Sequence, residues 1–229
     1  MNKKRFIPIS ILLFGLGYFS SSPINNFIRN LDNRKSSKNK TTKITALDIK
    51  GDPSIGRKDS VLSIIQFVDF ECPYSKHFVN VIYPKLKTEY IEKGLIRLIN
   101  KDLPMPFHKS AYLAAKVARC SIEQNNYKKV YEALFDNQKC LSCIGAKEIS
   151  IEAGNNPKSL EECLKNNKIG LAINSNISEA KINNIQGTPS FIIYDSKNEK
   201  LHEGVITGVL PWNAFKRKID NSLNKVSKN

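Results

Sequence analysis

The spacing of apolar residues along the chain predicts alternating strands and helices. Residues 61–70 are β-branched and aromatic enough for a buried strand. Apolar positions then recur at helical spacing over 73–92, including Phe78, Val81 and Tyr90, with Pro84 expected to bend the helix. Further helices are predicted at 108–124, 127–135, 145–153, 157–166, 171–182 and 211–223, and further strands at 44–49, 95–99, 190–194 and 201–206. This order indicates an α/β domain.

The N-terminus has a different pattern. Three basic residues at positions 3–5 precede an apolar run over 6–19 and three serines at 20–22, which is the layout of a secretory signal. Pro23 fits poorly just after a cleavage site, so an uncleaved membrane anchor is the alternative, although the run is shorter than the ~20 residues that span a bilayer. We therefore expect a signal peptide or anchor at 1–22, a flexible basic linker at 23–43, and one domain at 44–229.

The net charge of +15 is concentrated near the N-terminus. Residues 1–43 contain nine Lys and Arg and one Asp, so the remaining 186 residues carry +7. The domain lacks a dense basic stripe with interleaved aromatic residues, so the sequence does not favour nucleic-acid binding. Attraction of the leader to anionic membrane is the better alternative, and a solvated lysine-rich surface is the simplest explanation.

The residues that carry the clearest chemistry follow the first buried strand. Cys72 and Pro73 come directly after the apolar run, and proline suits the first position of a helix because no amide hydrogen is needed there. Cys72 is thus predicted at a strand-to-helix junction. Its sulfur would face unpaired backbone amides and the positive end of the helix dipole, which favour a thiolate. A buried, inert cysteine is the alternative.

Two separated motifs give the chain a resemblance to a known family. Cys72-Pro73-Tyr74 and the distant stretch 187–191, Gly-Thr-Pro-Ser-Phe, resemble the DsbA-like thiol-disulfide oxidoreductases of the thioredoxin fold. The likeness includes residues 84–90 and 107–120 and runs through most of 45–222. It implies a thioredoxin-like fold with a helical insertion at about 107–183, and no cofactor. It further implies a nucleophilic Cys72, a cis Pro189 facing it, a Thr188 backbone that pairs with substrate peptide, and a Tyr74 that lines the substrate entrance.

The chain departs from the family pattern at two positions. The family has Cys-Pro-x-Cys, whereas Ser75 stands here in place of the second cysteine, and a serine cannot form a disulfide. Six residues before the first cysteine the family usually has a buried acid, and this chain has Gln66. We infer that the dithiol half of the usual mechanism is lost. Ser75 could still donate a hydrogen bond to the Cys72 thiolate.

The remaining four cysteines allow several pairings. Cys120 and Cys163 lie on two predicted helices, so a disulfide between them fits an oxidising compartment. Cys140 and Cys143 lie in a loop and could close a small ring, which leaves Cys72 as the odd thiol. Alternatively Cys140 or Cys143 acts as a displaced resolving thiol for Cys72, or the four cysteines bind zinc. A structural disulfide is the default, and we expect no metal.

These observations predict an exported, periplasmic or extracytoplasmic oxidoreductase, tethered to the inner membrane if residues 6–19 remain as an anchor. Its substrates would be cysteine-containing exported proteins, and an external thiol or redox partner would release each mixed disulfide from Cys72. Isomerisation or removal of mixed disulfides fits a single thiol better than net disulfide donation. The alternatives are a non-catalytic peptide-binding or chaperone-like module, and a dithiol oxidase that uses Cys140 or Cys143.

Overall fold

A central β-sheet organises the chain in the computed structural model, which describes residues 44, 47–196, 200–202 and 204–227. The expected leader at 1–22 and linker at 23–43 lie outside these residues. Within the described ranges, no helix combines the length and the apolar character needed to cross a bilayer.

The sheet is built around β2 (Leu62–Val68), in which every residue is buried. β3 (Ile96–Asp102) lies parallel to β2 on one side, and β4 (Ser190–Asp195) lies antiparallel on the other. β1 (Ser54–Ile55) pairs with β3 at one edge, while β5 (Lys200–Leu201) and β6 (Ile206–Thr207) both pair with β4. The sheet therefore mixes one parallel pair with antiparallel edges, and it confirms the thioredoxin-like α/β fold.

The helical run after β2 alternates between α-helical and π-helical segments: α2 (Pro73–His77), η1 (Phe78–Ile82), α3 (Tyr83–Leu86) and η2 (Lys87–Ile91). Pro84 has no amide hydrogen to donate, which interrupts the regular α-helical ladder. The π-helical turns shift the helical phase. As a result Val81, which the spacing predicted on the buried face, is 43% exposed. Gly94 ends the run with a φ of 71°.

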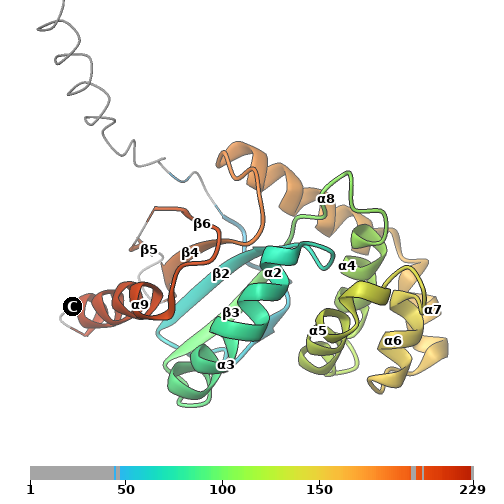
Figure 1. Cartoon of the computed structure of the whole chain (residues 1–229), viewed down its shortest axis with the longest axis horizontal. Helices are drawn as coiled ribbons and strands as arrows, with labels where there is room; N and C mark the ends of the chain where they lie inside the picture. Colours follow the sequence, from blue (N-terminus) through green and yellow to red (C-terminus); the bar gives the residue numbers. More distant parts are fainter. Residues whose placement is uncertain (1–43, 45–46, 197–199, 203, 228–229) are drawn as a thin grey trace, which may run out of the picture. The chain divides into compact units, whose positions relative to one another are not determined.

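Between β3 and β4 the chain forms the helical insertion that the resemblance implied, and Figure 1 shows its first four helices grouped beside the sheet. Its helices pack through small or apolar side chains; in α4 these include Ala114, Ala115 and Ala118, all buried. The insertion contains α4 (Ala111–Cys120), α5 (Tyr127–Asp136), the 3-10 turn η3 (Gln138–Cys140), α6 (Ala146–Glu152), α7 (Pro157–Leu164) and α8 (Asn167–Ile182).

The two faces of the sheet have separate apolar cores. Ile64 and Val68 of β2 belong to the larger core, with the run after Cys72, the insertion and α9 (Trp212–Val226). Ile65 and Phe67 point to the opposite face and pack in a smaller core with Ala180 of α8. This alternation follows from the two-residue period of a strand. Both cores together hold β2, and hence the start of α2, in place.

One of the two edge predictions is wrong. Residues 47–49 do not form a strand; the edge is β1 at Ser54–Ile55. The reason is a buried ionic cluster: the Lys101 ammonium donates to the Asp48 carbonyl and also pairs with Asp52, so side-chain contacts hold this segment instead of a ladder. The pairing of 201–206 with the strand at 190–194 is confirmed, through the short antiparallel pairings of β5 and β6 with β4.

The ionic cluster contains more carboxylates than cations. Lys101, fully buried, pairs with Asp52 and Glu179, while Arg119 pairs with Asp52 and Asp102. Burial raises the pKa of Asp102 to about 6, although Arg119 opposes the shift. Burial likewise raises the pKa of Glu179. Three carboxylates against two cations leave one excess negative charge, so the cluster takes up a proton more readily than isolated carboxyl groups do.

Candidate active site

Cys72 lies at the junction between β2 and α2, as the sequence predicted. It has extended backbone angles (φ −70°, ψ 122°), and Pro73 begins the helix after it. Its amide donates to the Asp69 carbonyl over 3.2 Å, which closes the turn that leads from the strand to the helix. The residue is 7% exposed and its thiol is free. The sulfur is therefore placed at the rim of the core, at the N-terminus of the helical run.

The segment before β4 lies against this sulfur. The Cys72 thiol donates to the Thr188 carbonyl, with Sγ 3.1 Å from the oxygen, across 116 positions of sequence. The Thr188–Pro189 bond is cis, and Ser190 begins β4 opposite Phe67 of β2. Sheet pairing thus brings the two motifs together. Among the described residues, the buried Thr188 hydroxyl has no hydrogen-bond partner.

Ser75 and Gln66, the two departures from the family pattern, are both buried. The Ser75 side chain is inaccessible and its hydroxyl has no partner within the described part of the chain, so the expected hydrogen bond to Cys72 is absent. Gln66 accepts a hydrogen bond from the Tyr131 hydroxyl at 3.1 Å, and burial raises the pKa of Tyr131. Tyr74, in contrast, is 68% exposed beside Cys72, where a substrate can reach it.

Asp69 connects the Cys72 turn to a second loop. Its buried carboxylate accepts from the amides of Glu71 and Met105, each at 2.7 Å. It also lies 2.7 Å from His108 Nδ1, and because an ionised carboxylate can only accept, that nitrogen donates. His108 is next to Phe107, which is 71% exposed. Asp69 thus fixes the Cys72 turn to the loop at 105–108 beside it.

Glu71 holds the same loop at its far end. Its carboxylate accepts from the amides of Ser110 and Ala111 at the start of α4, where backbone donors have no partner in the preceding turn of the helix. The helix α4 begins at Ala111, three residues after the predicted start at His108. The sequence contains no signal for these contacts of Asp69 and Glu71, because their partners lie more than thirty positions later. The only signal for His108 was its place in the stretch that carried the family resemblance.

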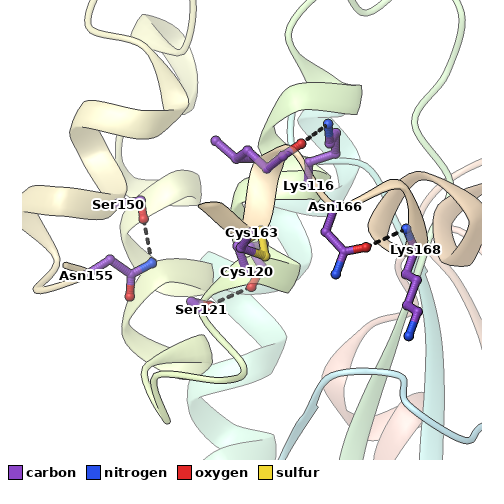
Figure 2. Close-up of a disulfide and its surroundings, with 10 residues drawn as sticks. Lys116, Cys120, Ser121, Ser150, Asn155, Cys163, Asn166 and Lys168 are labelled. Carbon is purple, nitrogen blue, oxygen red and sulfur yellow. Dashed lines mark hydrogen bonds between the residues drawn. A yellow bond between two sulfur atoms is a disulfide. The ribbon is translucent and has the colours of Figure 1, made fainter. Parts of the chain in front are cut away.

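The other four cysteines are disulfide-bonded, Cys120 to Cys163 and Cys140 to Cys143. Figure 2 shows the first bond joining α4 to α7, with Lys116 of α4 donating to a carbonyl at the end of α7. With all four sulfurs paired, the zinc alternative is wrong. Cys72 is bonded to neither Cys140 nor Cys143.

Comparison with known proteins agrees with this geometry. The thioredoxin family model matches residues 48–206. A protein-disulfide oxidoreductase of Rickettsia bellii is 25% identical over 194 residues, covering 82% of this chain and 72% of the relative. A Rickettsia conorii protein of the same description is 24% identical over 192 residues, covering 81% of this chain and 65% of the relative. Disulfide bond formation protein D of Bacillus subtilis is 24% identical over 160 residues, covering 64% of this chain and 69% of the relative.

Solved structures show the same fold. Alpha-DsbA1 of Wolbachia pipientis has a TM-score of 0.69 at 20% identity, covering 79% of this chain and 94% of its own. A periplasmic thioredoxin-like protein of Salmonella enterica has a TM-score of 0.64 at 24% identity, with 77% and 92% covered. With a free cysteine at the junction of β2 and α2 and a cis proline before β4, the chain belongs to the thioredoxin family, and the relatives that it resembles are described as protein-disulfide oxidoreductases.

Proposed function

We propose that this oxidoreductase acts through one thiol, Cys72, on protein disulfides or mixed disulfides. The observation that carries the proposal is the state of the cysteines. All five lie in the described residues, four are paired, and Cys72 alone is free. Ser75 occupies the buried position three residues later, where no sulfur is available to release a bound substrate.

The chemistry is thiol–disulfide exchange without net oxidation. The Cys72 thiolate attacks one sulfur of a client disulfide, a new sulfur–sulfur bond forms to Cys72, and the second client sulfur leaves as a thiolate. An external thiol, or another thiol of the client, then attacks the mixed disulfide at the client sulfur. Cys72 leaves as the thiolate, and the client sulfur ends in a new disulfide. One disulfide is consumed and one is formed, so the cycle exchanges or isomerises bonds.

The surroundings of Cys72 support an extended peptide as the substrate. The Thr188 carbonyl already lies 3.1 Å from the sulfur, so backbone groups of 188–189 are within reach of a chain bound there. We propose that Thr188 and Pro189 pair with the client backbone as an added strand. Tyr74 and Phe107, both strongly exposed, offer apolar contacts for client side chains. In this proposal Cys72 is the catalytic residue, and Ser75 only fills the space of a second cysteine.

We further propose that the protein works outside the cytoplasm on cysteine-containing exported proteins. The basic and apolar pattern of residues 3–19 supports export, and two disulfides fit an oxidising compartment. The similar Salmonella protein is described as periplasmic. A lasting anchor at 6–19 stays a prediction, as does the identity of the external thiol.

Trapping of client proteins tests the proposal. The full chain should form mixed disulfides with scrambled clients and should restore their native pairing, whereas Cys72→Ala should do neither. Ser178→Ala serves as the matched control because the hydroxyl of this exposed residue donates to Asn174 within its own helix and all five cysteines stay in place. If Cys72→Ala retains isomerase activity, the proposal is wrong. If the wild type forms no mixed disulfides and restores no pairing, but binds clients as well as Cys72→Ala does, the non-catalytic peptide-binding alternative is correct.

A further inference from the structure

The ring closed by Cys140 and Cys143 follows a turn that touches the Cys72 segment. Gln138, two residues before Cys140, donates its side-chain amide to the carbonyls of Phe70 at 2.8 Å and Cys72 at 3.0 Å. The Lys76 ammonium reaches the Asp136 carbonyl at 3.4 Å. The segment at 136–138 therefore contacts the Cys72 segment both before and after the start of α2.

The two disulfides differ in access and in the loops they close. Cys143 is exposed and Cys140 is half-buried, whereas Cys120 is 1% exposed and its partner Cys163 is half-buried, so the ring contains the most accessible of the four bonded cysteines. The bonded residues are 3 positions apart in the ring and 43 apart in the other bond. An attacking thiolate must reach a sulfur, and a short loop constrains the unfolded chain less. External thiols should therefore reduce the ring first.

The ring also fixes the turn in which Gln138 lies. The Cys140 amide donates to the Asn137 carbonyl at 2.8 Å, and the Cys140 carbonyl accepts from the amides of Cys143 and Ile144. Gln138 thus lies in the turn that ends at Cys140, directly before the ring that the disulfide closes. Opening the disulfide removes the covalent restraint next to this turn. A resulting movement of the turn would reach the carbonyls of Phe70 and Cys72 through the Gln138 side chain.

We propose that Cys140 and Cys143 form a second, exchangeable redox pair and that Gln138 transmits its state to the Cys72 segment. A small or peptide thiolate attacks the exposed Cys143 sulfur, and the Cys140 sulfur leaves and takes up a proton. A second thiol attacks the resulting mixed disulfide at the sulfur of the first thiol, which releases Cys143 as a thiol. Two external thiols are oxidised to one disulfide, and the ring disulfide is reduced to two thiols. The exchange is independent of Cys72, while the transmission to its segment rests on the function proposed above.

Exchange is tested in the full chain carrying Cys72→Ala. The protein is equilibrated in glutathione buffers of graded redox ratio, quenched in acid, alkylated and mapped by peptide mass spectrometry. Cys140 and Cys143 should become alkylated at a ratio at least tenfold more oxidising than the ratio that exposes Cys120 and Cys163. Simultaneous reduction of both disulfides, or earlier reduction of Cys120, would overturn the exchange. Because Cys72 is absent, the result does not depend on its function.

Transmission is tested by the rate at which iodoacetamide alkylates Cys72. Cys140→Ser with Cys143→Ser should change this rate at least threefold, and the same pair of substitutions should change it by less than 1.5-fold when Gln138→Ala is already present. Gln186→Ala is the matched control. This glutamine is exposed, and its side-chain amide donates a hydrogen bond to Asn184 instead of to the Cys72 segment. An equal change with and without Gln138, or none in either background, refutes transmission. A wild type without isomerase activity but with transmission intact would refute only the function proposed above.

Discussion

Removing the Cys120–Cys163 bond should destabilise the domain far more than removing the Cys140–Cys143 ring. The first bond joins α4 to α7 across a sequence separation of 43, so it closes a loop that includes α5 and α6. In the chain-entropy description, a loop of this length corresponds to about 4 kcal/mol of folding stability. The ring, with a separation of 3, corresponds to about 2 kcal/mol in the same description.

The expected shift in melting temperature follows from the size of the domain. At about 2–4 °C per kcal/mol for a domain of this size, loss of the long-range bond should lower the melting temperature by about 8–16 °C. Alanine is the suitable replacement for both cysteines because Cys120 is buried, where a serine hydroxyl would need a partner.

Urea unfolding and scanning calorimetry of three proteins give the comparison: the wild type, Cys120→Ala with Cys163→Ala, and Cys140→Ser with Cys143→Ser. The first double variant should lose about 2 kcal/mol more than the second. Equal losses, or a larger loss for the ring variant, would refute the assignment of the long-range bond as the structural one. Either result would also remove the loop-length argument for reducing the ring first.

Other substitutions test the site and the ionic cluster. Ser75→Cys should restore a dithiol, so that Cys72 forms a disulfide with the introduced sulfur and trapped mixed disulfides decrease, as measured by mass spectrometry. Glu71→Ala should remove the acceptor for the first amides of α4 and cost about 1–2 kcal/mol in urea unfolding. Asp69→Asn should cost about 2–3 kcal/mol and slow isomerisation, because the turn before Cys72 loses its charged acceptor. Asp102 has a pKa of about 6 in the folded protein and 3.8 in the unfolded chain, so the folded state binds its proton more tightly. The free energy of unfolding should therefore fall by about 3 kcal/mol through this group as the pH rises from about 4 to 6. In urea unfolding, Asp102→Asn should remove that part of the pH dependence.

The strands and helices of the core could be predicted from the sequence because their signals are local. A β-branched run predicted β2, and helical spacing predicted every helix of the insertion to within a few residues. The edge strand predicted at 47–49 failed because the geometry of this segment depends on Lys101, more than fifty residues later. A lysine is normally read as exposed, whereas this one is fully buried among carboxylates. Sequence spacing carries no signal for such a cluster.

The features of the active site also fall into those with a local sequence signal and those that depend on distant residues. The junction of Cys72 with Pro73 follows from local pattern, but its contact with Thr188 could be expected only from the family resemblance. Gln138 and His108 were missed because their partners are carbonyl and carboxylate groups that the fold brings together. The absence of a hydrogen bond from Ser75 to Cys72 in the described part of the chain likewise depends on side-chain orientation, which no spacing specifies.

The most direct test of the single-thiol mechanism is one turnover with a glutathionylated client peptide. The wild-type protein, free of external thiol, is mixed with a stoichiometric amount of the peptide and examined by intact-mass and peptide mapping. We predict a mixed disulfide on Cys72 that persists until glutathione is added, with both internal disulfides unchanged. Absence of a mixed disulfide on Cys72, or recovery of the peptide or glutathione on Cys140 or Cys143 instead, would contradict the mechanism.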